Sequence, residues 1–352
     1  MYNILLHATA YAKVGTYLDE LKSGVKPSRY LEARLATCGI NSLDIIGLLE
    51  LLVNTKKPQI FAESAIRGDG TDWNAQELSI LGDLSIAVSV TVFDDGRHRH
   101  PQVHVSPFSA TLLFTPGALL RNDQEATPAD WDEVTKNGSI DQTAYNALYE
   151  RRLLPLFAYA NEQAQAAGYQ AVMTLPGLGC GQFAGPFQGQ LGNSLQLALE
   201  SLLERHGHQW PNIAVVWFDP YAECTSSTQS IHGIKFKVRP LARGHNDTPQ
   251  LCLPEVYREL DPTDQPLHLF SIVAWDHVSW PGNDFYAGAR TTDDGVKAAA
   301  TSAMMTMTGF EGVYDPRYWK YLPPAGFALW EDVVRRNNLV IQVRDRLRIY
   351  SA

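Results

Sequence analysis

The pattern of apolar and polar residues predicts several helices in the first 75 residues. Apolar side chains recur there at spacings of three and four, which is the period of a helix with one buried face. Three segments share this pattern: 17–22, 28–37 and 41–53. Ser28 and Asn41 stand at the start of two of them, where residues that cap a helix are common.

A β-rich section follows, and beyond it predicted strands and helices alternate. Residues 84–93 predict a strand, and Asp94-Asp95-Gly96 predicts a turn into a return strand at 103–115, which Pro107 interrupts. Later strands are predicted at 170–175, 213–218, 233–238, 267–274 and 339–350. Helices are predicted at 143–167, with a kink at Pro155, and at 193–206 and 294–308. This alternation favours an α/β fold, a three-layer α/β/α sandwich around a mixed sheet.

Length and composition are consistent with one large core. The chain has 352 residues, of which 45% are hydrophobic, and this is enough for an α/β core with additions. No internal repeat, low-complexity tract or obvious linker divides the sequence. We therefore predict a helical extension over residues 1–75, packed on a core that spans residues 76–352.

Charge and cysteine content limit the partners and the compartment. The formal net charge is -9, whereas a nucleic-acid backbone is bound by clustered Lys and Arg, so no nucleic-acid partner is expected. The basic run at 97–100 follows an acidic turn and is interpreted as a hairpin tip. No secretory signal and no apolar run of about 20 residues is present, so no membrane partner is expected. The four cysteines show no CxxC or metal-ligand spacing, which favours a reducing, cytoplasmic location.

A glycine-rich loop is the first candidate site. It follows the predicted strand at 170–175 and reads LPGLGCGQFAG from Leu175 to Gly185. Glycines let the backbone approach a ligand closely, and successive N–H groups in such a loop form a nest for anions. No Gly-Lys-Ser/Thr follows, so the loop is not a Walker A motif. On spacing alone, a tight strand-to-helix turn is the alternative interpretation.

The motif GLGCGQFAG resembles the phosphate-binding loop of macrodomains, especially of the poly(ADP-ribose) glycohydrolase-like branch. The resemblance implies a macrodomain-like fold whose loop surrounds the pyrophosphate of ADP-ribose, with Phe183 near the distal ribose. It therefore implies a set of substrate-binding loop residues: Gly177, Gly179, Cys180, Gly181, Gln182 and Phe183.

An acid-rich segment is the second candidate site. It reads WDHVSWPGNDFYAGARTTDDG over residues 275–295 and joins a predicted buried strand to a predicted helix. Acids placed where a strand ends and a helix starts usually face a ligand in a layered α/β protein, because the crevice lies at the carboxyl ends of the strands. The two segments together predict a phosphate cradle that faces a carboxylate pocket.

The spacing within this segment adds a second resemblance. Asp276, Asp284 and Asp294, followed by a helix, resemble the aspartate set of the MavL family of Legionella macrodomain effectors. That family implies removal of ADP-ribose from arginine-modified ubiquitin, in the cytoplasm of the producing cell or of a host cell. The chain lacks the GGG-x(6–8)-QEE signature of poly(ADP-ribose) glycohydrolases, which argues against polymer cleavage. It also lacks the Asn-containing substrate loop of the commoner macrodomain hydrolases.

The chemistry of this cleavage suits carboxylates. The N-glycosidic bond breaks through an oxocarbenium-like transition state, and carboxylates stabilise that charge, bind ribose hydroxyls and activate water. A carboxylate also recognises the arginine that carries the ADP-ribose. We predict Asp284 and Asp294 as the catalytic pair, with their individual roles open, and Asp276 as a ligand-positioning residue. The cluster lacks the His and Cys set of a zinc site, so no metal or cofactor is expected.

Several neighbouring residues have two interpretations. Asp293 or Asp294 could be the N-cap of the helix that follows, because Asp is common there. Asn283 could bind a ribose hydroxyl or only form a turn, and Asp219, at a strand end, could contact adenine or cap the next turn. His277 is a weaker candidate for a general acid.

Other functions are consistent with the same loops. A reader macrodomain would bind ADP-ribose without cleaving it, but a reader needs a single carboxylate for the adenine rather than several beside the distal ribose. Hydrolysis of another ADP-ribose derivative, phosphorylated or acetylated, would use the same fold. A purely structural role is disfavoured by two ligand-type loops at predicted strand ends.

Overall fold

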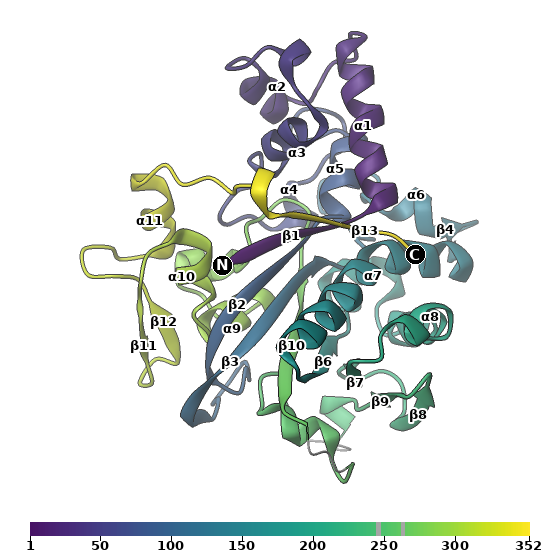
Figure 1. The fold of residues 1–352 in the computed structure, drawn as a ribbon. Helices are drawn as coiled ribbons and strands as arrows, with labels where there is room; N and C mark the ends of the chain where they lie inside the picture. The colour runs from purple at the N-terminus through teal and green to yellow at the C-terminus, as the bar shows by residue number, and fades with distance from the viewer. Residues whose placement is uncertain (244–247, 262–264) are drawn as a thin grey trace.

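The computed structural model describes residues 1–243, 248–261 and 265–352, and these residues form a nine-stranded mixed sheet with helices on both sides (Figure 1). The strands lie in the order β13-β1-β2-β3-β10-β6-β7-β9-β8. Their bounds are β1 (Tyr2–His7), β2 (Ser85–Asp94), β3 (Val103–Pro116), β6 (Gln170–Pro176), β7 (Ile213–Asp219), β8 (Ser227–Ile231), β9 (Ile234–Val238), β10 (Leu267–Trp275) and β13 (Leu347–Tyr350). Two short hairpins stand apart: β4 (Thr135–Lys136) with β5 (Ser139–Ile140), and β11 (Val313–Asp315) with β12 (Lys320–Leu322).

Helices cover both faces of this sheet and confirm the predicted α/β/α sandwich. One face packs against α7 (Gln142–Ala167) and α8 (Leu191–His206), which lie together in front of the sheet in Figure 1. The core on the other face includes residues of α9 (Asp293–Ala299), α10 (Ala303–Thr308) and α11 (Trp330–Arg336), and of the N-terminal helices α1 (Ala8–Lys22), α2 (Arg29–Leu35), α3 (Ile45–Val53), α4 (Ala62–Ala65) and α5 (Ala75–Gly82). A short α6 (Trp131–Val134) precedes α7.

The strands are apolar on both sides because both faces are covered. Ile4 and Leu6 of β1 lie in the core beneath the N-terminal helices, whereas Leu5 between them lies in the core beneath α7. Strands buried on both faces have continuous rather than alternating apolar patterns. None of the helices in the described ranges has the length and apolar character that a membrane span needs.

The predicted elements are largely found, with several differences. The predicted helix at 41–53 begins only at Ile45, and Asp44 rather than Asn41 is its N-cap. The first 75 residues are not only helical, because Tyr2–His7 pairs with both β2 and β13 in the main sheet. The predicted strand at 339–350 is shorter, since only Leu347–Tyr350 pairs with β1. The predicted helix at 294–308 is two helices, because Ser302 N–H leaves the helix to bond Thr91 O at 3.0 Å.

Pro107 is a further difference. Pro107 does not interrupt β3, which runs from Val103 to Pro116. β10 pairs with β3 only from Ala110 onward, so Pro107 lies where β3 has no partner on that side and needs no N–H there. α7 is one continuous helix that contains Pro155, and a kink there stays a prediction.

The parallel strands bring the two candidate sites to one edge of the sheet. β3, β10, β6 and β7 share a direction and are neighbours, so their carboxyl ends meet at the same edge. Pairing of β10 with β6 ends at Ser271 and Thr174, although β10 continues to Trp275. The two strands therefore separate just before the glycine-rich loop and the acid-rich segment begin.

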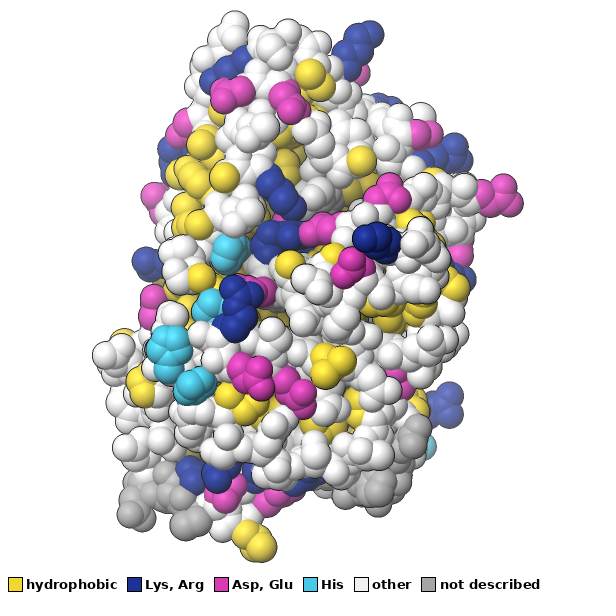
Figure 2. Space-filling view, turned by 90° about the vertical axis from the view of Figure 1, so that its right-hand side faces the viewer, with side chains coloured by type: hydrophobic (Ala, Val, Ile, Leu, Met, Phe, Trp, Pro, Cys, Tyr) yellow, Lys and Arg dark blue, Asp and Glu magenta, His cyan; other side chains and the backbone are white. Residues whose placement is uncertain are grey.

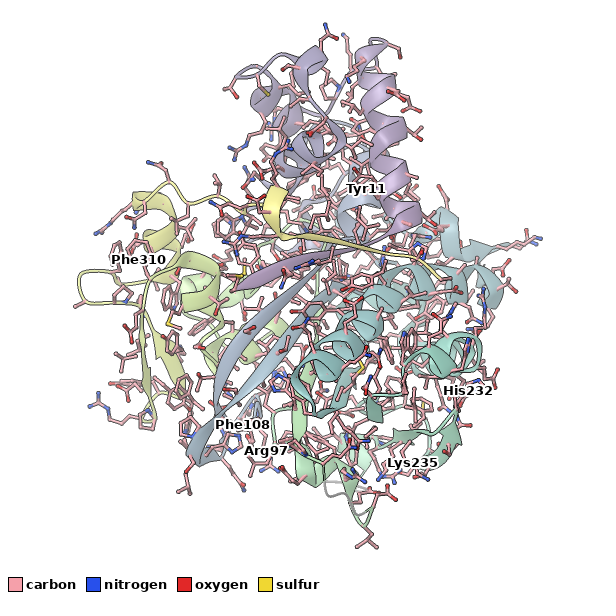
Figure 3. All side chains as sticks on the ribbon, in the orientation of Figure 1. Tyr11, Arg97, Phe108, His232, Lys235 and Phe310 are labelled. Atoms are coloured by element: carbon pink, nitrogen blue, oxygen red, sulfur yellow. The ribbon has the colours of Figure 1, made fainter. Side chains whose placement is uncertain are left out.

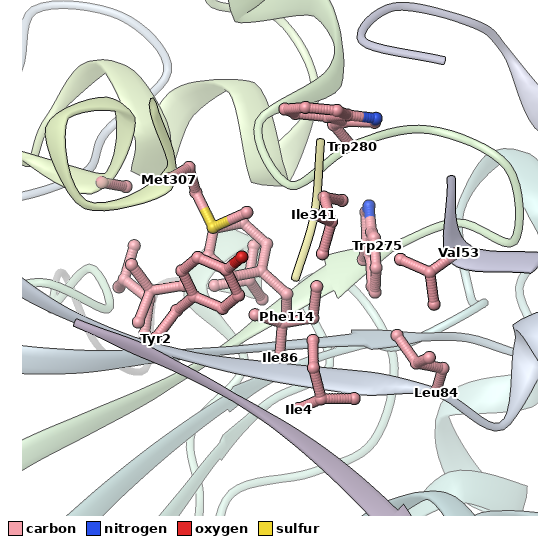
Figure 4. Packing of buried hydrophobic residues seen from close by; sticks show 14 of the residues in the cluster. Tyr2, Ile4, Val53, Leu84, Ile86, Phe114, Trp275, Trp280, Met307 and Ile341 are labelled. Carbon is pink, nitrogen blue, oxygen red and sulfur yellow. The ribbon is translucent and has the colours of Figure 1, made fainter. Parts of the chain in front are cut away.

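A tightly packed aromatic core supports the acid-rich segment. Trp275 and Trp280 lie in the same buried cluster as Val53, Phe114 and Ile341, as Figure 4 shows. The residues on either side of the predicted boundary at residue 75 thus share one core. The assignment of 1–75 as a separate extension stays a prediction.

Candidate functional site

The glycine-rich loop after β6 packs closely against the loop after β3. A Cβ on Gly117 would overlap the backbone of Gly179, and a Cβ on Gly179 would lie 2.9 Å from the backbone of Ala118. Gly179 has a φ of 73°, which favours glycine. The Tyr149 hydroxyl on α7 joins the loops, accepting from Ala118 N–H at 3.0 Å and donating to Leu178 O at 2.7 Å. The protein's own contacts therefore hold the loop in shape.

Backbone donors of this loop remain available. Among the residues that the structure describes, no protein hydrogen bond uses the N–H groups of Gly177, Gly179 or Gly181. A cavity of about 310 Å³ opens at the same loop and is lined by Arg121, Gly181, Gln182, Gly185 and Gln188. The unused N–H of Gly181 lies beside this cavity, as in a nest that binds phosphate, whereas Gly179 is buried against Gly117.

The other predicted loop residues have distinct environments. Gln182 is exposed, and its side-chain oxygen accepts from Arg121 at 2.6 Å. Phe183 packs, half-buried, against the core that contains Trp280. Cys180 is buried, and burial raises the pKa of its thiol well above the usual range, so it is no thiolate nucleophile.

Asp276 is fully engaged by its own loop. Its Oδ1 accepts from the N–H groups of Val278 and Ser279, each at 2.7 Å. Its Oδ2 accepts from the Ser279 hydroxyl at 2.6 Å and the Asn283 amide at 3.2 Å. Asn283 also accepts from Ile60 N–H at 3.0 Å. Both polar atoms of Asn283 therefore shape the loop, and its contact with a ribose stays a prediction.

Asp284 is engaged to the same degree. Its Oδ2 accepts from Thr291 N–H at 2.8 Å, Thr292 N–H at 3.1 Å and the Thr291 hydroxyl, and its Oδ1 lies 2.7 Å from the Thr292 hydroxyl. A Cβ on Gly295 would overlap Asp284 Oδ1. The carboxylate thus fits against the start of α9 only because residue 295 is glycine.

Asp294 differs from the other two aspartates. Its Oδ1 accepts from Gly295 N–H at 3.0 Å and lies 2.7 Å from the Thr292 hydroxyl. Its Oδ2 is buried and has no hydrogen-bond partner in the described residues. Burial, followed by the nearby charge of Asp276, raises the pKa of Asp294 well above its usual range. A neutral carboxylic acid is the favoured form in such a site.

The N-cap of α9 is Thr292, whose hydroxyl accepts from Gly295 N–H, and neither Asp293 nor Asp294 has this position. Asp293 has another role, because its Oδ2 accepts from Ala274 N–H at 2.8 Å. Ala274 lies beyond the point where β10 leaves β6, so its N–H would otherwise lack a partner. Asp293 therefore supplies the hydrogen-bond acceptor that β6 no longer offers to this part of β10.

Lys297 lies at the same edge, and Gln250 connects it to Asp219 at the end of β7. Lys297 is buried, donates to Ile272 O at 2.6 Å and lies 3.1 Å from Asp293. Asp219 accepts from the N–H groups of Tyr221 and Leu241 at 2.8 and 3.0 Å, so it caps the turn after β7. Burial raises the pKa of Asp219, and a contact with adenine stays a prediction.

The N-terminal region supplies residues that no sequence pattern assigned to this site. Lys56 is buried and donates to His277 O at 2.6 Å and to Asp276 O at 3.3 Å. Its ammonium lies 4.1 Å from the ring centre of Trp275, and burial lowers its pKa to about 7. The backbone of Lys57 also bonds to the acid-rich segment: its O accepts from Trp280 N–H at 2.7 Å, and its N–H donates to Val278 O at 2.8 Å. Neither periodicity nor a motif marks these two lysines.

His277 belongs to a buried charge network rather than to an open site. Its Nε2 lies 3.3 Å from Asp130, which accepts from Arg152 at 2.7 Å and from Leu119 N–H at 2.8 Å. Burial alone would raise the pKa of Asp130, but Arg152 and His277 hold it well below its usual range. Arg152 donates to Gly117 O at 2.9 Å. The network therefore connects the acid-rich segment to the loop beside the glycines.

The described surface has a second cavity away from these two loops. This cavity of about 270 Å³ lies at the amino ends of β6, β7 and β9, the opposite edge of the sheet, where Figure 3 labels His232 and Lys235. On the face in Figure 2, acidic, basic and histidine side chains are interspersed. Within the described ranges, no three His, Cys, Asp or Glu side chains are arranged to hold a metal ion.

These features define a class of protein. A mixed sheet between two helical layers, with a glycine-rich loop at the carboxyl end of a central strand, is a macrodomain-like α/β sandwich. The model of the family described as "Macrodomain effector MavL" matches residues 2–327, so the chain belongs to the MavL macrodomain effector family. The curated proteins contain no match to it. Family membership confirms the predicted resemblance and implies an ADP-ribose-related macrodomain function.

Proposed function

We propose that the protein is an ADP-ribosylhydrolase that removes mono-ADP-ribose from an arginine of a modified protein, with ubiquitin as the leading substrate. It would act in the cytoplasm of the producing cell or, as an effector, in that of a host cell. Membership of this macrodomain family supports ADP-ribose as the ligand. Hydrolysis and the substrate are the further steps of the proposal.

One observation carries the proposal. The loop with unused N–H groups at Gly177, Gly179 and Gly181 and the segment with Asp276, Asp284 and Asp294 follow the neighbouring strands β6 and β10. The N–H groups suit the pyrophosphate, with Phe183 near the distal ribose. A ligand held in this way would extend toward the acids that follow β10.

The acids suit the chemistry of the bond. Cleavage between the ribose carbon and the arginine nitrogen builds positive charge on the ribose ring, and buried carboxyl groups stabilise it. Of the predicted pair, one of Asp284 and Asp294 would activate water, and the other would hold the ribose or the departing guanidine. Asp276 would position the ligand through the loop that it organises. No step requires a metal or cofactor.

The test is release of ADP-ribose from arginine-modified ubiquitin by the wild type, Asp284→Ala and Asp294→Ala, with ADP-ribose binding measured on all three. We expect turnover by the wild type and loss of about 100-fold or more in each variant, with binding retained. Exposed Asp19→Ala on α1 is the matched control.

The reader function is the alternative. Binding of ADP-ribose by the wild type without release from any ADP-ribosylated protein would establish it. The observation that favours it is the full hydrogen bonding of Asp276 and Asp284, which leaves few carboxylate oxygens for chemistry. The free oxygen of Asp294 favours the hydrolase.

A further inference from the structure

The Thr292 hydroxyl lies between two buried carboxyl groups. It is 2.7 Å from Asp284 Oδ1 and 2.7 Å from Asp294 Oδ1, and it accepts from Gly295 N–H at 3.1 Å. A hydroxyl has one proton, so it donates to only one of two carboxylates. The second 2.7 Å contact requires a proton on a carboxyl oxygen, since two bare acceptors repel at that distance.

The other hydrogen bonds decide which carboxyl group carries that proton. Asp284 accepts from three further donors of Thr291 and Thr292, so its oxygens are already occupied as acceptors. Among the described residues, Asp294 has one further donor, the N–H of Gly295, and its Oδ2 has none. The proton therefore belongs on Asp294, with the Thr292 hydroxyl donating to Asp284 and accepting from Asp294.

We infer that Thr292 is a positioning residue whose hydroxyl joins Asp284 and Asp294 into a pair that holds one proton, carried by Asp294. The charged and titratable groups around Asp294 agree with this assignment. They are Asp276 from the loop after β10, Asp284 and Tyr286 from the 3-10 turn at 283–287, and Asp293 and Lys297 from α9. Three of these five are carboxyl groups, which disfavour a further negative charge.

The proton gives Asp294 a role in the reaction, and this part rests on the proposed function. As the bond between the ribose carbon and the guanidine nitrogen breaks, its electron pair leaves with the nitrogen, and Asp294 gives its proton to that nitrogen. A water oxygen then bonds to the ribose carbon, and the Asp294 carboxylate takes the proton that the water loses. The resting pair is restored, so Asp294 is the acid of the pair that activates water, and Asp284, which accepts from the Thr292 hydroxyl, is the acid that holds the ribose or the departing guanidine.

The inference is tested by infrared difference spectroscopy, which detects the C=O stretch of a protonated carboxyl group. The wild type at pH 7 should show such a band that is missing in Asp294→Asn, and Thr292→Ser should keep it. In Thr292→Val the midpoint of the Asp294 titration should move down by about one pH unit, because the protonated carboxyl group loses the oxygen that accepts its proton, whereas the ionised form loses no donor.

Helix capping alone predicts a different result. Thr292→Val would then lower the melting temperature and leave the band and its midpoint unchanged, as we expect for loss of the Ser28 cap of α2 in Ser28→Ala. No band difference between wild type and Asp294→Asn would overturn the inference, and so would equal midpoints in wild type and Thr292→Val. The spectra need no turnover, so absence of hydrolysis with the predicted spectra would reject only the proposed function.

Discussion

The glycine-rich loop and the acid-rich segment lie at the same edge of the sheet but use their polar groups in opposite ways. The loop after β6 keeps N–H groups of Gly177, Gly179 and Gly181 unused and surrounds itself with small residues. The segment after β10 uses its buried carboxylate oxygens internally, and one oxygen of Asp294 is the buried exception in the described residues. The first arrangement suits binding of an anion, and the second suits precise placement of one acid.

This difference has an energetic basis. The exposed N–H of Gly181 can remain hydrated until a ligand replaces the water, so leaving it unused costs little. A buried carboxylate without partners is costly, and the chain therefore surrounds Asp276 and Asp284 with donors. The single unpartnered oxygen on Asp294 is then a local cost that function would explain.

The largest expected effect comes from Gly295→Ala. The new Cβ would occupy the position of Asp284 Oδ1, so the carboxylate must leave the start of α9. We expect turnover to fall by about 1,000-fold while ADP-ribose affinity changes little, measured by kinetics and calorimetry. Gly207→Ala, at a helical position with ordinary 3.4 Å contacts, is the matched control. Turnover near the wild-type rate would show that the position of Asp284 is unimportant.

Gly181→Ala tests the other region. A Cβ there has nothing within 4 Å in the free protein, so the variant should fold and melt like the wild type. If phosphate lies in the nest, the Cβ meets the ligand, and affinity for ADP-ribose should fall by about 30-fold, roughly 2 kcal/mol. Gly39→Ala, equally open but remote in the N-terminal helices, is the control. Unchanged affinity would place the ligand elsewhere.

Lys56→Met tests whether the N-terminal region holds the acid-rich segment in place. The change removes the donor to the carbonyls of Asp276 and His277 inside the core, which loosens the acid-rich segment. We expect a loss of about 10-fold in turnover and a destabilisation of about 2 kcal/mol, measured by kinetics and urea unfolding. Lys57→Met is the control. It removes a half-exposed ammonium 4.2 Å from the Tyr30 ring and should change neither turnover nor the free energy of unfolding.

The smallest effect is a pH dependence of stability. The pKa of Asp294 is raised on folding, so its contribution is fully present below the unfolded pKa and is lost as pH rises through the folded value. In urea unfolding from pH 4 to 9, the wild type should lose stability relative to Asp294→Asn, by about 1.4 kcal/mol for each pH unit that separates the unfolded and folded pKa. Exposed Asp19→Asn should follow the wild type. Parallel curves for wild type and Asp294→Asn would contradict the raised pKa.

The sequence predicted those elements whose signal is local. The run at 213–218 becomes Ile213–Asp219, because a strand buried on both faces must be continuously apolar. The strand Tyr2–His7 was missed, because its partner β13 lies at the other end of the chain and no short-range pattern announces that pairing.

The candidate site shows the same limit. Spacing located the aspartates, but it could not tell that Asp276 and Asp284 are saturated with donors and Asp294 is not. That distinction depends on Thr291, Thr292 and the distant Ile60 and Lys56, which meet the acids only after folding. The hydrogen-bonding role of each acid is therefore a property of the fold, and the motif alone does not contain it.

The most direct measurement of the division between the two regions is a KM-against-kcat comparison for release of ADP-ribose from arginine-modified ubiquitin. We predict that Gly181→Ala raises KM and keeps kcat, whereas Asp294→Asn keeps KM and loses kcat by about 100-fold or more. Wild-type release with both parameters changing together in both variants, or no release at all, would contradict the assignment of binding to the glycine-rich loop and cleavage to the acid-rich segment.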